Sequence, residues 1–112
     1  MLGQAQLSPN EMSALTDLMA ALRSHWPFAN FKLFGSKARG TADAKSDVDL
    51  LVVLPCPITE EIRRRIVHTV FDINLSQESN ISVLIVSEEE WQHSLISLLP
   101  IHAAVEREGI AL

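Results

Sequence analysis

The sequence predicts an α+β fold with one small mixed sheet of three or more strands, flanked by helices. Some segments repeat apolar residues at helical spacing, whereas others are short unbroken apolar runs of strand length. Capping residues and prolines separate these segments, in the order helix, strand, strand, helix, strand, helix. This order fits an α+β sandwich built on one sheet, and 112 residues suffice for one domain, residues 1–112.

The first helix is expected to begin at residues 8–11, Ser-Pro-Asn-Glu. The serine can cap the helix, the proline fits the first turn, and the glutamate can reach back to the cap. Pro27 closes the segment. Apolar residues recur between these limits at helical spacing and predict a buried face: Met12, Leu15, Leu18, Met19 and Leu22.

Two strands are predicted next, at residues 28–34 and 48–54. The second is continuously apolar after Asp49, which indicates burial on both faces, and Pro55 ends it. Thr59 then caps a helix that runs from residue 60 to about residue 76. One face of this helix is apolar: Ile62, Ile66, Val70 and Ile73.

The last part of the chain contains the third strand, at residues 81–86. Residues 87–90, Ser-Glu-Glu-Glu, form a second capping box and are expected to open a helix through about Leu99. After Pro100 a short helix is expected to reach Glu108, before Gly109. The apolar tail 110–112 or an edge strand could pair with a second chain, so a homo-oligomer is possible.

Composition excludes several function classes. The formal net charge is −5, which argues against a broad nucleic-acid-binding surface, and aromatic residues for base stacking are scarce at 5%. Cys56, the one cysteine, cannot form an internal disulfide and lacks the neighbours of a metal knuckle. The sequence contains no signal peptide and no long apolar span, so we expect a cytoplasmic protein without membrane contact.

The most informative stretch lies between the first two strands. Gly35 and Ser36 open a turn where backbone can approach a phosphate, and a helix that starts there would aim free N–H groups at it. Asp47 and Asp49 lie two apart at a strand start, so both carboxylates are expected to face one spot while Val48 turns into the core. Two such carboxylates, with substrate phosphates, suit Mg²⁺. The structural alternative is an ordinary turn and loop.

These residues resemble the signature of the DNA polymerase β-like nucleotidyltransferases: Gly-Ser, ten residues, then Asp-x-Asp. Residues 38–40, Ala-Arg-Gly, and Ser46 are similar to the minimal nucleotidyltransferase branch of that superfamily. The resemblance covers most of the chain and implies the polymerase β-like nucleotidyltransferase fold. By resemblance, Gly35 and Ser36 would bind the triphosphate.

Further site roles are implied by the same resemblance. Asp47 and Asp49 would be catalytic and would hold magnesium. Arg39 matches an arginine of the family motif, and two roles are open for it: a phosphate contact, or a structural pairing with a carboxylate such as Asp43.

The resemblance implies a magnesium-dependent transfer of a nucleoside monophosphate, AMP from ATP, to a hydroxyl. The acceptor would dock from outside, and in the minimal branch it is a helical HEPN protein, commonly a toxic RNase. The chain would then be an antitoxin that attaches AMP to a tyrosine of its partner. The alternative is a degenerate binding module that blocks or scaffolds the HEPN partner. Transfer to a small molecule such as an aminoglycoside is a minor third option.

The predicted third strand departs from the family pattern. Relatives with full activity place a third carboxylate at its start, and here Ser82 stands in that position. Serine carries no charge and is a poor base unless it is activated. Three explanations are open: Asp72 or Glu78 supplies a carboxylate, a partner brings its own base, or the chain binds a nucleotide without transferring it.

The basic run 63–65, Arg-Arg-Arg, lies on the predicted helix 60–76. Such a run is usually a solvated face. In an acidic chain it could also contact a partner or nucleotide phosphates, and the sequence leaves both readings open.

Overall fold

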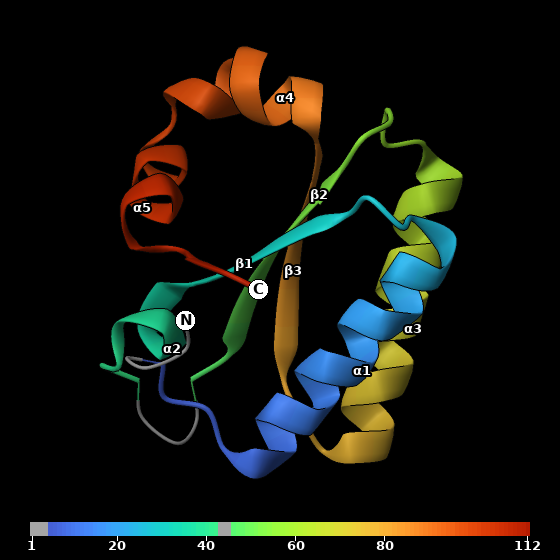
Figure 1. Ribbon diagram of the computed structural model, residues 1–112, viewed down its shortest axis with the longest axis vertical. Helices are drawn as coiled ribbons and strands as arrows, with labels where there is room; N and C mark the ends of the chain where they lie inside the picture. Colours follow the sequence, from blue (N-terminus) through green and yellow to red (C-terminus); the bar gives the residue numbers. More distant parts are fainter. Residues whose placement is uncertain (1–4, 43–45) are drawn as a thin grey trace.

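The computed structural model describes residues 5–42 and 46–112, and they form a four-stranded mixed sheet with helices on both faces (Figure 1). The helices α1 and α3 lie side by side on one face, and α4 and α5 lie on the other (Figure 1). The elements in chain order are α1 (Pro9–His25), β1 (Asn30–Phe34), α2 (Gly35–Arg39), β2 (Val48–Leu54), α3 (Glu60–Gln77), β3 (Ile81–Ser87), α4 (Glu88–His93), the 3₁₀ helix η1 (Leu95–Leu98), α5 (Pro100–Glu108) and β4 (Ile110–Ala111).

The strand order is β3-β2-β1-β4. Strand β1 pairs antiparallel with β2 and with β4, whereas β2 and β3 are parallel. Parallel neighbours need a crossover connection, and α3 supplies it. The predicted α+β fold with a small mixed sheet is therefore confirmed, and the register brings Phe34 and Ser82 to either side of Asp49.

Residues alternate across β2 and serve two hydrophobic cores. Val48, Leu50 and Val52 are fully buried on the side of α1 and α3. Leu51 belongs to a second, smaller core with Trp91 of α4 and Val105 of α5. Since side chains two apart on a strand share a face, Asp49 lies on the same face of the sheet as Leu51 and this second core, near the start of β2.

Most predicted helix boundaries are confirmed. Ser8 caps α1 in a complete capping box with Glu11, and Thr59 caps α3 by accepting a hydrogen bond from the N–H of Ile62. The predicted apolar faces of both helices are buried or half-buried, except that Met12 in the first turn of α1 is exposed. Among residues 5–42 and 46–112, no helix has the length and apolar content that crossing a membrane requires.

Three details differ from the prediction. The first strand begins at Asn30, because the N–H of Ala29 still bonds the Trp26 carbonyl in a turn after α1 and leaves Phe28 exposed. The helix expected to reach Leu99 ends at His93, because Ser94 caps a separate 3₁₀ turn. The short helix α2 was absent from the predicted order.

The C-terminal tail has a partner within its own chain. Ile110 and Ala111 form β4, which pairs with Leu33 and Lys32 of β1. The N–H of Leu112 also donates to the Phe31 carbonyl. The tail is therefore the edge strand of the sheet, next to β1, and its pairing with a second chain stays a prediction.

Candidate active site

Gly35 and Asp49 are in direct contact at the end of the sheet. Gly35 has φ +76°, a left-handed conformation that side chains disfavour, and it starts α2 directly after β1. A Cβ atom at Gly35 would overlap Oδ2 of Asp49. The Phe34↔Asp49 pairing of β1 and β2 sets this approach, so the Gly-Ser turn lies against the second aspartate.

Asp47 and Asp49 form a pair of interacting carboxylates. Asp47 precedes β2 and is exposed, whereas Asp49 is the second residue of β2 and is half-buried. The pKa of Asp49 is raised, first by burial and then by the negative charge of Asp47, while Arg39 acts in the opposite direction. A cation between the two carboxylates would relieve this repulsion.

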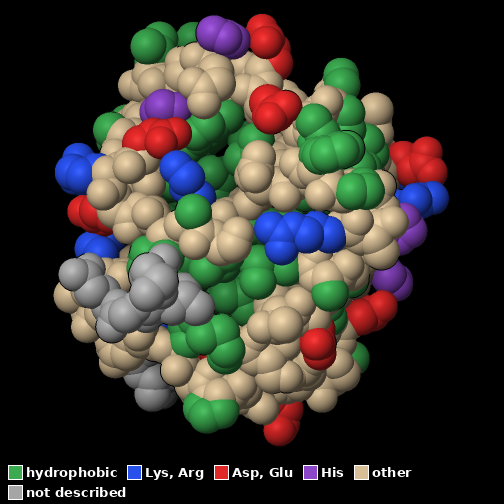
Figure 2. All heavy atoms as spheres, in the orientation of Figure 1, with side chains coloured by type: hydrophobic (Ala, Val, Ile, Leu, Met, Phe, Trp, Pro, Cys, Tyr) green, Lys and Arg blue, Asp and Glu red, His purple; other side chains and the backbone are tan. Residues whose placement is uncertain are grey.

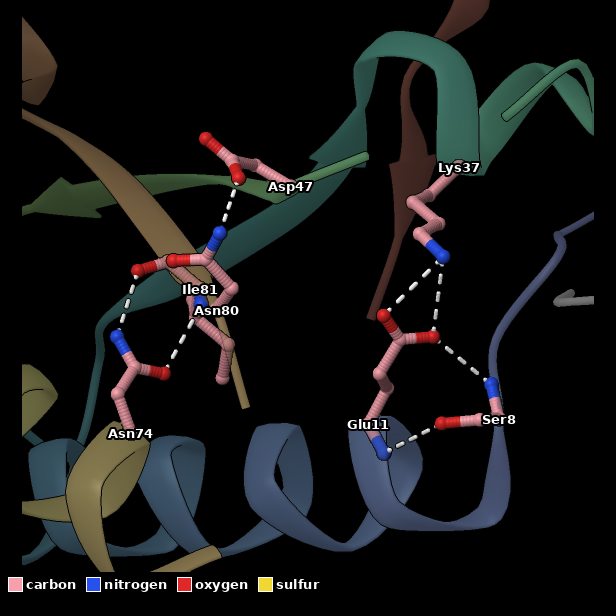
Figure 3. A network of polar contacts seen from close by, with 7 residues as sticks. All are labelled: Ser8, Glu11, Lys37, Asp47, Asn74, Asn80 and Ile81. Carbon is pink, nitrogen blue, oxygen red and sulfur yellow. Dashed lines mark hydrogen bonds and ion pairs between the residues drawn. The ribbon is translucent and has the colours of Figure 1, made fainter. Parts of the chain in front are cut away.

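The turn between α3 and β3 holds Asp47 in place (Figure 3). The amide Nδ2 of Asn80 donates a hydrogen bond to Oδ1 of Asp47, and the Asn80 carbonyl accepts from the N–H of Val48 at 3.0 Å. Asn74 fixes the turn itself: its Oδ1 accepts from the N–H of Ile81 at 2.9 Å, and its Nδ2 donates to the Ile81 carbonyl at 3.0 Å. Sequence reasoning missed both asparagines, although Asn80 directly precedes the predicted third strand.

Ser82 lies beside Asp49, because the two residues are partners in the parallel β2–β3 register. Neither alternative carboxylate joins the aspartate pair. Asp72 lies on an exposed part of α3, with its Oδ2 3.3 Å from Nε2 of His68, and Glu78 is exposed at the α3 C-cap. In the described part of the chain, no three His, Cys, Asp or Glu residues form a group that could hold a metal ion.

Arg39 links α2 to the end of α5. Its Nη1 lies 3.2 Å from Oε2 of Glu108, and this hydrogen bond is the main reason why the pKa of Glu108 is lowered. The carboxylate observed beside Arg39 is therefore Glu108, and Asp43 lies outside the described residues. Arg39 also acts electrostatically on Asp49. Its side chain is 45% exposed, so it remains accessible to a ligand.

Ser36 and Lys37 follow Gly35 in α2. Ser36 is half-buried, and its carbonyl accepts from the N–H groups of Gly40 and Thr41, which closes the turn. The Lys37 side chain is only 5% exposed, and its Nζ lies 3.1 Å from Oε2 of Glu11 (Figure 3).

The Lys37–Glu11 ion pair ties the Gly-Ser turn to the first turn of α1. Glu11 also accepts from the Ser8 N–H at 2.9 Å as part of the α1 capping box. The backbone adds a further link, because the Gln6 N–H donates to the Lys37 carbonyl at 2.8 Å. Sequence reasoning missed this pair, because a lysine next to a glycine-serine turn is ordinarily solvent-exposed.

A hollow lies between the sheet and the helices α4 and α5 (Figure 2), with a volume of about 370 Å³. At its wall, Glu106 accepts from Trp91 Nε1 at 2.6 Å and pairs with Lys32 at 3.1 Å, which lowers the pKa of Glu106. The residues that line this hollow do not include those of the aspartate site. Through these contacts Glu106 of α5 binds both Trp91 of α4 and Lys32 of β1.

Comparison with known proteins shows the family and the fold of the chain. A sequence model of the family described as "Nucleotidyltransferase domain" matches residues 15–108. The fold is similar to a Sulfolobus solfataricus crystal structure provisionally assigned as a nucleotidyltransferase, with TM-score 0.55 and 18% identity over 89% of this chain and 77% of that chain. It is also similar to a chain in a toxin–antitoxin crystal structure with AMP-PNP, with TM-score 0.56 and 21% identity over 88% of this chain and 69% of that chain. No curated protein matches the chain in sequence.

Proposed function

The chain belongs to the nucleotidyltransferase domain family, and we propose that it transfers a nucleoside monophosphate, AMP from ATP, to a hydroxyl group of a partner protein. The observation that carries this proposal is the contact between Gly35 and Asp49. It brings the backbone turn suited to phosphates against the carboxylates suited to a metal ion. A turn that only connects two strands does not require a glycine with positive φ in contact with an aspartate carboxylate.

The donor set fits magnesium. Mg²⁺ is commonly bound by one or two carboxylates together with substrate phosphates, and Asp47 and Asp49 provide two. The raised pKa of Asp49 supports this assignment, because part of the shift comes from the unneutralised charge of Asp47. When bound, the ion would supply charge neutralisation at the phosphates.

The remaining residues bind and orient the nucleotide. We assign the backbone of Gly35 and Ser36 to binding of the triphosphate. Two roles are assigned to the exposed guanidinium of Arg39: it binds a phosphate oxygen, or it keeps its ion pair with Glu108. In the reaction an acceptor oxygen attacks the α-phosphorus, the bond to the β-phosphate oxygen breaks, and pyrophosphate leaves. The acceptor proton needs a base, and Ser82 beside Asp49 has no charge to serve as one, so we assign that role to the partner protein.

The proposed acceptor is a HEPN-family toxin, for which this chain would act as antitoxin. The similarity to a chain of a toxin–antitoxin structure with AMP-PNP supports such a partner and supports an adenine nucleotide. The resemblance to the minimal nucleotidyltransferase branch supports a tyrosine hydroxyl as the attacking group.

One observation favours a second function. Ser82 occupies the strand position next to Asp49, and neither Asp72 nor Glu78 replaces the missing carboxylate. A chain with this site could neutralise or scaffold its HEPN partner by complex formation alone, with a nucleotide bound or absent.

A transfer assay separates the two functions. The purified chain, Mg²⁺, α-labelled ATP and the HEPN protein encoded beside it are incubated, with Asp47→Asn/Asp49→Asn as the inactive variant and Asp72→Asn as the matched control. Label on the partner that the double variant loses and Asp72→Asn keeps would support transfer. A stable complex with no label under any nucleoside triphosphate would overturn transfer and favour the binding function.

A further inference from the structure

The outward face of α3 exposes a stripe of large apolar side chains. Val67 is 51% exposed, Phe71 63% and Leu75 70%. The core face of the same helix is occupied by Ile66 and Val70, which are buried. Residues four apart lie above one another on a helix, so the three exposed side chains form one continuous row. Neither the hydrophobic cores nor the proposed site uses this row.

Two opposite charges are separated from Phe71, the centre of this row, by the same number of residues in the sequence. Arg64 precedes Phe71 by seven residues and Glu78 follows it by seven, at the C-cap of α3. Among the described residues, neither Arg64 nor Glu78 forms an ion pair. The set Arg64, Val67, Phe71, Leu75 and Glu78 has the spacing 3, 4, 4, 3, which is the same from either end.

We propose that this stripe, from Arg64 to Glu78, is a homodimer interface in which two copies of α3 pack antiparallel. In a two-fold interface the same patch serves both copies, so residue i of one copy contacts residue j of the other and the reverse. Phe71 then lies on the two-fold axis and meets its own counterpart. Val67 lies opposite Leu75 of the second copy. Spacings of three and four residues are those of helices that pack at shallow crossing angles.

Charge complementarity selects a second copy as the occupant. In the antiparallel arrangement Arg64 of each copy lies opposite Glu78 of the other, so the apolar centre has an ion pair at both ends. A further set of exposed apolar residues, Leu95, Leu98 and Leu99, has no such symmetric pair of charges. An anionic membrane surface would require a basic border, whereas the stripe has an acidic residue at one end.

The oligomeric state of the full-length chain tests the interface. By sedimentation velocity, we expect the wild type to have twice the mass of one chain and Phe71→Glu to have the mass of one chain. Leu98→Glu is the matched control, because Leu98 is 80% exposed outside the stripe, and it should remain dimeric. Far-UV circular dichroism checks that each variant is folded. A wild type that stays monomeric at several hundred micromolar, or a dimer that Phe71→Glu leaves intact, overturns the proposal.

Charge reversal and cross-linking test the antiparallel register. Arg64→Glu should weaken the dimer at least tenfold, and Arg64→Glu/Glu78→Arg should restore it, because the double variant exchanges the two charges. In a Cys56→Ser background, Phe71→Cys should form an intermolecular disulfide with itself. Val67→Cys should do so only when mixed with Leu75→Cys. Cross-linking of Val67→Cys with itself at a similar rate would overturn the register, and capture of the stripe by the HEPN partner in place of the dimer would overturn the choice of occupant.

Discussion

The carboxylate of Asp49 occupies the space that a side chain on Gly35 would need. The two residues come from different strand ends, and the β1–β2 pairing brings them together. Gly35 therefore satisfies two separate requirements: a left-handed backbone with φ +76°, and close contact with an acidic group.

We predict that Gly35→Ala destabilises the protein and abolishes transfer. The left-handed conformation alone should cost about 1–3 kcal/mol in free energy of unfolding. Displacement of the Asp49 carboxylate should reduce the transfer rate more than tenfold. Gly40→Ala is the matched control, because Gly40 also has a positive φ, +75°. Chemical unfolding and the labelled-ATP assay measure the two effects, and equal activity losses in both variants would contradict the specific role of the Gly35–Asp49 contact.

Asp49→Asn should stabilise the metal-free protein while it removes activity. Burial and Asp47 raise the Asp49 pKa in the folded state. A carboxyl with a raised folded pKa favours folding when it is protonated, and this contribution is lost as the pH rises through the folded pKa. At neutral pH the ionised group therefore opposes folding. We expect a higher Tm for Asp49→Asn at pH 7 in EDTA, and a gain that shrinks as the pH falls through the raised pKa of Asp49 and is lost below the ordinary pKa of aspartate.

Magnesium should reverse this order of stability. The ion should raise the Tm of the wild type and leave that of Asp49→Asn nearly unchanged, because binding to the folded state stabilises it. Asp72→Asn, an exposed carboxylate on α3, controls for general loss of charge. A Tm of Asp49→Asn at or below the wild-type value at pH 7 in EDTA would count against the electrostatic account.

Asn80→Ala should weaken the site without unfolding the chain. It removes the amide that donates to Asp47, while Asn74 still holds the α3–β3 turn. Loss of a residue that orients a metal ligand typically reduces metal affinity or activity about 10–100-fold. We expect a loss of that size in kcat/KM, partly recovered at high Mg²⁺. Full activity at limiting Mg²⁺ would show that Asp47 needs no such support.

Ser82→Asp should improve the site. It places a third carboxylate beside Asp49 in the β2–β3 register, at an exposed position that tolerates charge. Because this carboxylate adds a ligand for the metal ion while the partner protein still supplies the base, we expect a higher transfer rate at limiting Mg²⁺. Mn²⁺ titration should also show tighter binding, and Ser82→Asn is the uncharged control. If Ser82→Asp and Ser82→Asn behave alike, the missing carboxylate does not limit the reaction.

Lys37→Met should destabilise the fold by about 3 kcal/mol, because it leaves Glu11 in a mostly buried site without its cation. The double variant Lys37→Met/Glu11→Gln should lose less than the sum of the two single losses, because no charge is then left unpaired. Urea unfolding of the four proteins measures this coupling. Strictly additive losses would mean that the two side chains act independently.

Much of the fold could be predicted from local signals. The β2 limits 48–54 and the helix caps at Ser8, Thr59 and Ser87 depend on neighbouring residues, and the structure agrees with them. The pairing of the tail with β1 joins residues far apart in sequence, so no local pattern reveals it.

In the candidate site, too, local signals could be predicted and contacts between distant residues could not. Gly35, Ser36, Asp47 and Asp49 form one short motif and could be found in the sequence. Asn80 contacts Asp47 across 33 positions, and Lys37 contacts Glu11 across 26. Arg39 meets Glu108 only because α5 returns to α2. These partners depend on the tertiary fold, and single residues of such types are usually solvent-exposed.

The α3 crossover has a consequence for synthesis on the ribosome. The Gly35–Asp49 half of the site is complete in sequence as soon as β2 has been made, but Asn80 and Ser82 follow only after all of α3. Pairings between distant segments form slowly, because a long loop must close before they are made. A nascent chain that has emerged only through β2 therefore carries the motif without Asn80, whose side-chain amide bonds Asp47. Docking of β3 onto β2 is the step that turns this motif into a site.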